Sequence, residues 1–496
     1  MRSAPDSQLG DATLILRGCD VLVRPGDLRR AVDVAIAGNR IASLTPTGGE
    51  LPARVEVLDA RHLLALPGLV NAHSHSPENC LRGAGEGLPL EVWLARMFGT
   101  AGVYGPDDHY ACALAGALEM LLTGGTTIVD HLWMTPPAVE AVEAVLRAYR
   151  DIGVRAAVAP LVFDVDDTGR LAEKLGFDLR GALFTDVAGV LPVSELQAQL
   201  EELLRRWHGA EGGRLQVFAG PCGPQWCSDE LLVGLAETAA RHESCLHIHL
   251  LESPLQTHVC RVRFGTGAVE GLDRLGLLGP RTSLAHCVWL SPEDIEVIAE
   301  RGAVVVHNPS ANMRLGSGRA PVPELVAAGV TVALGADGSA SSDSQVVWTQ
   351  LKLAALVHND GIRERWIGGA QALAMATTGG AAALGLAGAA GVLEPGALAD
   401  VVLVDLLGDG LTGAQALEAA LALSETGRAV RHVLVDGRLV VRDGRCLTVD
   451  EQAVREALAE QRAKRAAAGR EPPPATLEAM RKLQAFRRLV LAEDAA

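Results

Sequence analysis

The sequence predicts an α/β fold, in which a TIM-like (β/α)8 barrel carries a small β-sandwich domain built from both chain ends. Short alternating apolar runs near the two ends predict strands. Between them, apolar runs alternate with longer amphipathic segments, a pattern typical of parallel strands joined by helices. The 496 residues have room for a barrel, which takes about 250 residues, and for a second domain.

The β domain is predicted from residues 1–63 and 395–448 together. Turn signals such as Pro25-Gly26-Asp27 separate the N-terminal runs, which occupy residues 12–16, 20–23, 32–36 and 40–44. Four short strands bury little surface alone and need a partner sheet. The C-terminal runs supply one, with Asp436-Gly437 as a hairpin signal, at residues 400–404, 430–435 and 438–441.

Residues 64–394 are predicted to form the barrel. Continuous apolar runs there indicate strands buried on both faces, separated by helical segments such as residues 110–122, 137–151, 194–207 and 292–300. Eight strand–helix units are what such a barrel requires. The predicted strands end near His75, Asp130, Pro160, Gly220, Leu250, His286, His307 and Asp337. The long connection at residues 161–193 is expected to be either a lid over the barrel mouth or a solvated loop.

Residues 449–496 are predicted as a C-terminal helical tail. Two helical stretches, residues 450–467 and 475–491, are split by Glu471-Pro472-Pro473-Pro474. Their charges and alanines indicate a surface or oligomer-contact segment without chemistry of its own. We expect a homodimer or a higher homo-oligomer.

Composition and charge narrow the partners and the location. A net charge of −16 argues against a nucleic-acid polymer as partner, because phosphate contacts need basic surface, while free bases and nucleosides stay open. No uncharged apolar stretch outside the glycine-punctuated segments reaches the ~18 residues of a membrane span. The nine scattered cysteines and an N-terminus without a signal sequence predict a cytoplasmic protein with reduced thiols.

The most informative stretch is the predicted strand that ends in His73-Ser74-His75. Because side chains alternate along a strand, the two imidazoles point to the same side, about 7 Å apart along the backbone. They form a chelating pair. A strand end that merely satisfies a hydrogen-bond network is the alternative, so the metal hypothesis depends on further ligands at the same place.

Further polar residues follow other predicted strands, namely His249, His286, His307 and Asp337. In a barrel the carboxyl ends of the strands converge on one mouth. Several imidazoles, one carboxylate and an open position for water match a catalytic zinc or iron site, where the metal lowers the pKa of its water toward ~7. Glu252, just past His249, would then carry a proton between water and substrate.

The other histidines keep more than one interpretation. His247 lies deeper on its strand, and core packing or a role behind the metal ligands both stay open. His307 would either contact substrate or brace the mouth. His131 is expected to be mainly structural, although it follows a strand end.

The motifs at residues 67–75, 81–83 and 88–94 resemble those of the amidohydrolase superfamily, in its branch of metal-dependent aromatic-heterocycle deaminases. Later motifs of that branch follow in the same order, at residues 247–252, 285–291, 307–312, 335–341 and 393–400. The resemblance covers residues 12–445. Within the branch the chain is similar to 8-oxoguanine, hydroxyatrazine and S-adenosylhomocysteine aminohydrolases alike, which differ in substrate.

The resemblance implies one divalent metal ion, Zn²⁺ or alternatively Fe²⁺, held by His73, His75, His249 and Asp337. It also implies that Asp337 acts as general base, that Glu252 shuttles a proton, and that His286 orients the water and stabilises the developing negative charge. Two-metal members of the superfamily generally carry a carboxylated lysine at the end of strand four. Residues 215–222 contain no lysine, which favours one metal.

Candidate substrate contacts are Trp93, His131, Gln225 and His307. For Gln225 a plain loop role is the alternative. The chain departs from the family pattern at Ser74, at Ala336 and in residues 221–227, so the resemblance does not define the substrate.

We therefore predict hydrolysis of a C–N bond other than a peptide bond: deamination of a purine, pyrimidine, pterin or triazine type of heterocycle, with release of ammonia. Loss of an alkylamine or halide, ring opening, and a catalytically silent binding protein stay open as alternatives. Silent barrels usually lose a metal ligand or the acid–base pair, and this chain keeps both. The deaminase fold with Pro-Cys-x-x-Cys is excluded, because Pro221-Cys222 is followed by Cys227.

Overall fold

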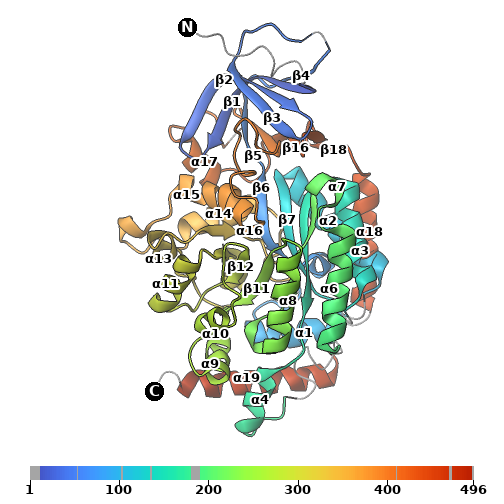
Figure 1. Cartoon of the computed structure of the whole chain (residues 1–496), viewed down its shortest axis with the longest axis vertical. Coiled ribbons are helices and arrows are strands. Elements are labelled where there is room, and N and C mark those ends of the chain that lie inside the picture. The colour runs from blue at the N-terminus through green and yellow to red at the C-terminus, as the bar shows by residue number, and fades with distance from the viewer. Residues whose placement is uncertain are drawn as a thin grey trace.

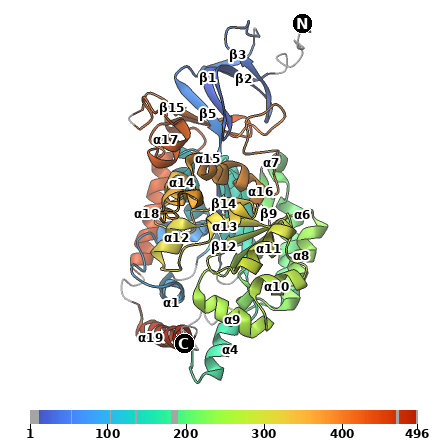
Figure 2. The same ribbon diagram turned by 90° about the vertical axis from the view of Figure 1, so that its left-hand side faces the viewer.

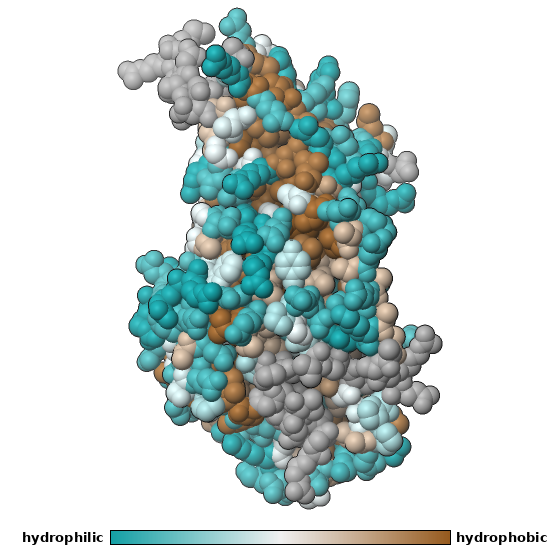
Figure 3. Space-filling model, turned by 90° about the vertical axis from the view of Figure 1, so that its right-hand side faces the viewer, coloured by the Kyte–Doolittle hydropathy of each residue, from teal (hydrophilic) through white to brown (hydrophobic). Residues whose placement is uncertain are grey.

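The computed structural model describes residues 12–52, 54–101, 104–134, 137–179, 190–408, 410–467 and 472–493. A mixed β-sheet occupies one end of the molecule and a barrel surrounded by helices occupies the middle (Figure 1). On the face in Figure 3, apolar side chains gather toward the end that carries the sheet, and hydrophilic ones cover much of the remainder. None of the described helices has the length and hydropathy needed to cross a membrane.

The mixed sheet joins the two ends of the chain, as the sequence predicts. Its order is β18-β17-β16-β15-β5-β1-β2-β3, with β4 also paired to β1, and the ends meet where β15 runs antiparallel to β5. Apolar residues of both ends, including Leu16, Ile36 and Leu403, share one buried cluster. The strands are β1 (Leu14–Arg24), β2 (Asp27–Ala37), β3 (Arg40–Pro46), β4 (Glu56–Asp59), β5 (Leu63–Pro67), β15 (Val401–Asp405), β16 (Val430–Val435), β17 (Arg438–Arg442) and β18 (Arg445–Cys446).

The barrel consists of parallel strands in the order predicted, and the (β/α)8 fold class is confirmed. Its strands form two adjoining sheets, β6 to β10 and β11 to β14. Backbone bonds from Ala219 N–H to the Cys245 carbonyl (2.9 Å) and from Asp337 N–H to the His73 carbonyl (2.8 Å) close the two seams. The strands are β6 (Leu69–Ser74), β7 (Gly125–Leu132), β8 (Arg155–Val162), β9 (Leu215–Val217), β10 (Gly220–Pro221), β11 (Leu246–Leu250), β12 (Thr282–His286), β13 (Val304–His307) and β14 (Val332–Leu334).

Helices cover the outside of the barrel (Figures 1 and 2). Many begin with a polar cap, for example Ser291, whose hydroxyl accepts a bond from the backbone N–H of Asp294 while that carboxylate accepts from the Ser291 N–H. The longer helices are α1 (Leu90–Ala101), α2 (Pro106–Leu122), α3 (Val139–Ile152), α4 (Asp167–Lys174), α6 (Val193–Trp207), α8 (Asp229–Arg241), α9 (Pro254–Phe264), α11 (Pro292–Arg301) and α14 (Val347–Leu356). Shorter ones are η1 (Ser76–Cys80), η2 (Pro224–Trp226), α10 (Ala268–Arg274), α12 (Pro309–Arg314), α13 (Val322–Ala327), α15 (Gly369–Ala374), η4 (Met375–Gly379), α16 (Gly380–Ala383) and α17 (Leu417–Leu423).

The C-terminal tail is packed on the barrel rather than free on the surface. Helix α18 (Glu451–Ala467) lies against α2 and η1, and α19 (Pro474–Glu493) lies against α1 and α9. Leu483, Phe486 and Val490 of α19 are fully buried in a cluster with α1, α4 and α9. Both views place α19 at the end of the molecule opposite the mixed sheet, on the side of the strand carboxyl ends (Figures 1 and 2).

The long connection predicted as a lid or loop contains α4, which contacts α9 and η2 beside the barrel mouth. Residues 180–189 of this connection lie outside the described residues. The described part thus includes a packed helix, α4, flanked by non-helical residues.

The sheet and the barrel are joined by a buried ion network at the start of β8. Arg155 donates to Asp400 through Nε (2.7 Å) and to Asp436 through Nη2 (2.9 Å), and its side chain is only 2% exposed. Burial opposes the charge of the guanidinium, but the two carboxylates dominate and raise its pKa. The network ties β8 to both β15 and the hairpin between β16 and β17.

We expect Arg155→Ala to lower the free energy of unfolding by about 3–5 kcal/mol, because it leaves the buried Asp400 without its cation. Urea unfolding followed by circular dichroism measures the change. Arg481→Ala is the control: its side chain is 75% exposed and pairs with a half-exposed Glu478, so we expect a change within about 0.5 kcal/mol. Equal losses in the two variants would contradict a structural role for the network.

Candidate active site

The predicted metal ligands converge at the carboxyl ends of the barrel strands. His73 is at the end of β6 with His75 just beyond it, His249 is on β11, and Asp337 follows β14. Asp337 Oδ1 lies 3.4 Å from His75 Nε2 and 3.7 Å from His73 Nε2. His249 Nε2 lies 3.3 Å from His75 Nε2. These four side chains come from three strands, so the barrel, not the local sequence, brings them together.

Each imidazole is oriented by a partner on its far nitrogen. His75 Nδ1 lies 2.6 Å from the His131 carbonyl oxygen, and His249 Nδ1 lies 2.6 Å from the Cys222 carbonyl oxygen. His73 Nδ1 lies 2.7 Å from His247 Nε2. A carbonyl oxygen can only accept a hydrogen bond. In His75 and His249 the Nδ1 atom must therefore be the donor and carry the proton. Their Nε2 lone pairs therefore both face the centre of the cluster.

The donor set fits a cation. Two imidazole lone pairs 3.3 Å apart repel each other unless a positive charge lies between them. His73 Nε2 is buried and has no hydrogen-bond partner among the described residues. Ligand atoms about 2.0–2.1 Å from one tetrahedral ion are about 3.3 Å apart, close to the spacing seen here. Burial, together with neighbouring imidazoles, holds the pKa of His73 and His249 well below the ordinary value, which keeps the rings in the neutral, metal-binding form.

Neighbouring imidazoles make rival ligand sets. His73 is within ligand distance of His249 and His286, and also of His131 and His247. The second set is poorly suited to a metal, because His247 Nε2 is engaged with His73 Nδ1 at 2.7 Å. His247 in turn contacts Ser283 Oγ at 2.6 Å through Nδ1. The structure thus places His247 in contact with His73 on the side away from Asp337, which is consistent with a role behind the proposed metal ligands.

Glu252 and His286 lie beside the four donors. Glu252 Oε2 is 3.6 Å from His286 Nε2, which is 3.9 Å from Asp337 Oδ2. Glu252 Oε1 accepts a bond from Ser317 Oγ at 3.0 Å. Burial, with the nearby Asp337 adding to it, raises the pKa of Glu252 well above the ordinary value. A buried carboxyl with a raised pKa is suited to take and return a proton near neutral pH.

The backbone is strained where it carries these residues. His286 has φ 75° and Asp337 has φ 64°. These values lie in the left-handed region, which residues other than glycine rarely adopt. Each such residue costs of order 1–3 kcal/mol, which the surrounding structure must offset. His286 is held by a 2.9 Å contact from Nδ1 to Asn312 Oδ1, and Asp337 by the bond from its N–H to the His73 carbonyl. The strain therefore coincides with the cluster.

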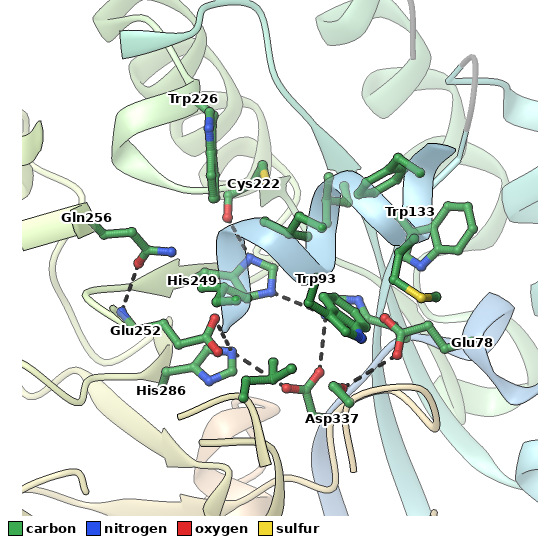
Figure 4. Close-up of a pocket in the computed structure, with 18 residues that line it drawn as sticks. Glu78, Trp93, Trp133, Cys222, Trp226, His249, Glu252, Gln256, His286 and Asp337 are labelled. Atoms are coloured by element: carbon green, nitrogen blue, oxygen red, sulfur yellow. Dashed lines mark hydrogen bonds and ion pairs between the residues drawn. The ribbon is translucent and has the colours of Figure 1, made fainter. Parts of the chain in front are cut away.

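A pocket opens beside the cluster (Figure 4). Apolar and aromatic side chains make most of its wall, and polar atoms gather on the side of His249, Glu252, His286 and Asp337. The described residues that line it are His75, Glu78, Leu90, Trp93, Leu94, Met97, Phe98, Trp133, Leu161, Cys222, Trp226, His249, Glu252, Gln256, His286, Leu315, Asp337 and Ser341. A wall of this kind suits a flat, largely apolar ligand with a few polar edges.

Of the four candidate substrate contacts, only Trp93 lines this pocket. His131 is fully buried and stacks on His249, with ring centroids 4.6 Å apart. Gln225 is buried behind the wall, with Cys260 Sγ 3.8 Å from its side-chain oxygen. His307 packs against His358 instead, with ring centroids 5.3 Å apart. The structure thus gives no support for direct contact by these three, because each side chain is enclosed behind the pocket surface.

The lining residues that were not foreseen as site residues include Glu78, Trp133, Trp226 and Gln256. Gln256 Oε1 accepts the backbone N–H of Glu252 at 2.8 Å and so orients the loop after β11. Its position one turn beyond Glu252 is a signal that could have been used. Burial raises the pKa of Glu78 to about 7, and the Asp337 carboxylate adds to the effect.

The C-terminal helix braces this side of the site. Arg487 Nε of α19 lies 3.2 Å from Glu91 Oε2 of α1, and Ser253 donates a short hydrogen bond to the other Glu91 oxygen. Ser253 follows Glu252 and caps α9 by accepting the Gln256 N–H at 3.3 Å. The tail is therefore connected to the Glu252 loop through two contacts.

We expect Arg487→Ala to destabilise the protein by about 1–3 kcal/mol, because the buried Glu91 then loses its cationic partner. Misplacement of the Glu252 loop should lower kcat/KM about 10-fold. Urea unfolding and steady-state kinetics measure the two effects. Arg488→Ala is the matched control, since Arg488 is adjacent but exposed. A variant at 487 that behaves like the variant at 488 would show that α19 does not support the site.

The chain belongs to the amidohydrolase family, whose model matches residues 64–440. It is 34% identical to the 5'-deoxyadenosine deaminase of Methanothermobacter thermautotrophicus over 450 residues, which cover 90% of this chain and 97% of that one. It is 33% identical to the 5-methylthioadenosine/S-adenosylhomocysteine deaminase of Moorella thermoacetica over 446 residues, 89% of this chain and 97% of that one. The family identified from the motifs is thereby confirmed.

Solved structures of similar enzymes support the same family and fold. The zinc complex of the atrazine chlorohydrolase TrzN from Arthrobacter aurescens superposes with a TM-score of 0.81 at 28% identity, covering 90% of this chain and all (100%) of that one. An adenosine deaminase from Xanthomonas campestris with bound zinc gives a TM-score of 0.80 at 26% identity, covering 92% of this chain and 99% of that one. The barrel with its added β-sheet is thus the architecture of metal-containing relatives.

Proposed function

We propose that this protein is a hydrolase that removes ammonia from an aminated N-heteroaromatic ring. The observation that carries the proposal is the convergence of four metal-type donors with Glu252 at one side of an aromatic pocket. Relatives named as deaminases of 5'-deoxyadenosine and 5-methylthioadenosine cover nearly the whole chain and support it. An adenine-type ring is accordingly the first substrate class to test.

We infer that His73, His75, His249 and Asp337 hold one divalent ion, Zn²⁺ or alternatively Fe²⁺. The spacing of their donor atoms, the neutral imidazoles and the zinc in two similar structures support this assignment. A bound divalent ion would supply Lewis acidity, which makes water nucleophilic at neutral pH. The short run β9 and β10 has no lysine to bridge a second ion.

The proposed roles of the chain follow from position and pKa. The Asp337 carboxylate would accept a proton from the attacking water, since its oxygens face both the imidazoles and His286. Glu252 would carry a proton to the ring and to the leaving amine, as its buried carboxyl binds a proton readily. His286, near both carboxylates, would orient the water and stabilise the negative charge that develops on its oxygen. Trp93 would offer an aromatic face to the ring.

The test is ammonia release by the metal-loaded protein from a panel of aminated purines and their nucleosides, pyrimidines, pterins and triazines. We expect turnover of at least one member, with loss of activity on chelation and recovery with added Zn²⁺ or Fe²⁺. Absence of ammonia from every compound, in protein that contains one metal ion per chain, would refute the deaminase proposal.

A second candidate, displacement of chloride or an alkylamine from a triazine, is favoured by the likeness to an atrazine chlorohydrolase structure. The same donors would serve it, because only the leaving group differs. Chloride and alkylamine release from chlorinated and alkylaminated triazines distinguish it from deamination.

We further propose that the chain works as a homodimer or higher homo-oligomer in the cytoplasm, with domains at residues 1–63 with 395–448, 64–394 and 449–496. Free thiols at all nine cysteines support a reducing compartment. The cluster shared by both chain ends supports the first division. Light scattering after gel filtration tests the assembly, and a monomer would refute it.

A further inference from the structure

Glu78 is a buried carboxylate in the pocket that the proposed mechanism does not use. It lies in η1, directly after the His73-Ser74-His75 stretch, and is only 3% exposed. In Figure 4 it lies beside Trp133, on the opposite side of the pocket from Glu252. A buried carboxyl group needs hydrogen-bond partners for both of its oxygens, and the described residues supply them for only one.

One oxygen of Glu78 is firmly held. Oε2 accepts the backbone N–H of Ala340 at 3.1 Å and Ser341 Oγ at 3.5 Å. The backbone of Gly338 makes room for it, since a Cβ at this position would lie 1.9 Å from Oε2. The loop after β14, which also carries Asp337, therefore fixes the direction of the carboxylate.

The other oxygen, Oε1, has no hydrogen-bond partner among the described residues. No lysine or arginine is found among the described residues that line the pocket, and the basic side chain that acts on Glu78 there is the His75 imidazole, which lowers its pKa. The pocket wall around it is largely aromatic and aliphatic, and Figure 4 shows the rings of Trp93 and Trp133 on this side. An acceptor with an unused lone pair, facing a ligand pocket and held rigid, is arranged to receive a donor from the ligand.

We propose that Glu78 is a specificity-determining residue, which selects substrates that present a hydrogen-bond donor on the side away from Glu252. This inference rests on the proposed deamination and names its substrate class more closely. The donor is either a hydroxyl group of a ring substituent or an N–H group of the ring itself. Both give the same bond to a carboxylate, while a substituent with its own carboxylate would be repelled in this acidic pocket.

Matched ligand pairs separate the two sources. 5'-Deoxyadenosine and its 2',3'-dideoxy derivative differ in the sugar hydroxyls, and adenine and 9-methyladenine differ in one ring N–H. We would measure kcat/KM for both pairs and the Kd of the corresponding deaminated products, which no longer react. The proteins are the metal-loaded wild type, Glu78→Leu, Glu78→Gln and Glu86→Gln, the last a control in an exposed part of the neighbouring loop.

We expect the wild type to prefer the donor-bearing member of one pair by about 10- to 100-fold, the range of a hydrogen bond to a charged group. Glu78→Leu should bring that ratio close to 1, and Glu78→Gln, which keeps a carbonyl acceptor, should lie between. Glu86→Gln should match the wild type. The ligand pair whose kcat/KM ratio falls in Glu78→Leu identifies whether the donor is a hydroxyl or a ring N–H group. Because both ligands of a pair are measured on the same preparation, the ratio of their kcat/KM values does not depend on how much of a variant is folded.

Unchanged ratios in Glu78→Leu, or no preference by the wild type in either pair, would overturn the inference. A wild type that releases no ammonia from any compound would instead refute the proposed deamination. The Kd ratios of the products would still decide the role of Glu78 in that case, so the two failures are distinguishable.

Discussion

Replacement of Glu252 by glutamine is expected to lower kcat for the proposed deamination by about 10²–10⁴-fold, the usual contribution of a positioned acid–base group. The amide keeps the size of the side chain and its bond from Ser317, but it cannot take and return a proton. Since Glu252 is not among the proposed ligands, the metal content should stay at that of the wild type. Loss of activity without loss of metal is the expected signature.

Steady-state ammonia release and elemental analysis of the same preparation measure both quantities. Glu296→Gln provides the control, because Glu296 is an exposed carboxylate on α11 and should leave both values unchanged. If Glu252→Gln kept more than a tenth of the wild-type kcat, or lost its metal, Glu252 would not be the proton carrier.

Much of the architecture follows from simple periodicity. The apolar runs that end at His75, His249, His286 and Asp337 lie in strands at the predicted places, because a strand buried on both faces needs such a run. The barrel topology then requires their carboxyl ends to meet. The convergence of these side chains could therefore be expected from the sequence, whereas their roles are a proposal.

The pocket wall could not be predicted in the same way. Glu78 lies in a short 3-10 helix without apolar periodicity, and its position in the pocket depends on the loop after β14. His131, Gln225 and His307 lie in or near the carboxyl ends of strands, yet they are buried and do not line the pocket. Position at the end of a strand places a residue at the mouth of the barrel. Whether its side chain faces the pocket depends on how the neighbouring side chains pack.

The tail shows a second limit. The charges and alanines of residues 475–491 resemble those of a surface helix, but Leu483, Phe486 and Val490 at helical spacing form a buried stripe. That stripe indicates that one face of the helix is buried, but it does not indicate which surface the face packs against. The partner proves to be the α1, α4 and α9 side of the barrel mouth, which makes α19 part of the support of the site.

Metal content should separate the proposed ligands from the other histidines of the cluster. We expect His249→Ala to lose most of the bound metal, because it removes one of four donors and the remaining three are poorly held without it. His131→Ala is the matched control: the ring is equally buried and stacks on His249 at 4.6 Å, but its Nε2 is directed at the Gly220 carbonyl oxygen. That variant should keep nearly one ion per chain.

The contrast decides between two ligand sets that share His73. If His131→Ala lost its metal and His249→Ala kept it, the ion would lie in the set of His73, His131 and His247, deeper in the barrel. Asp337 is not part of that set, so its proposed role would have to be given up. Because both variants remove a buried imidazole, their losses in stability should be similar. A difference in metal content therefore reports on coordination, not on folding.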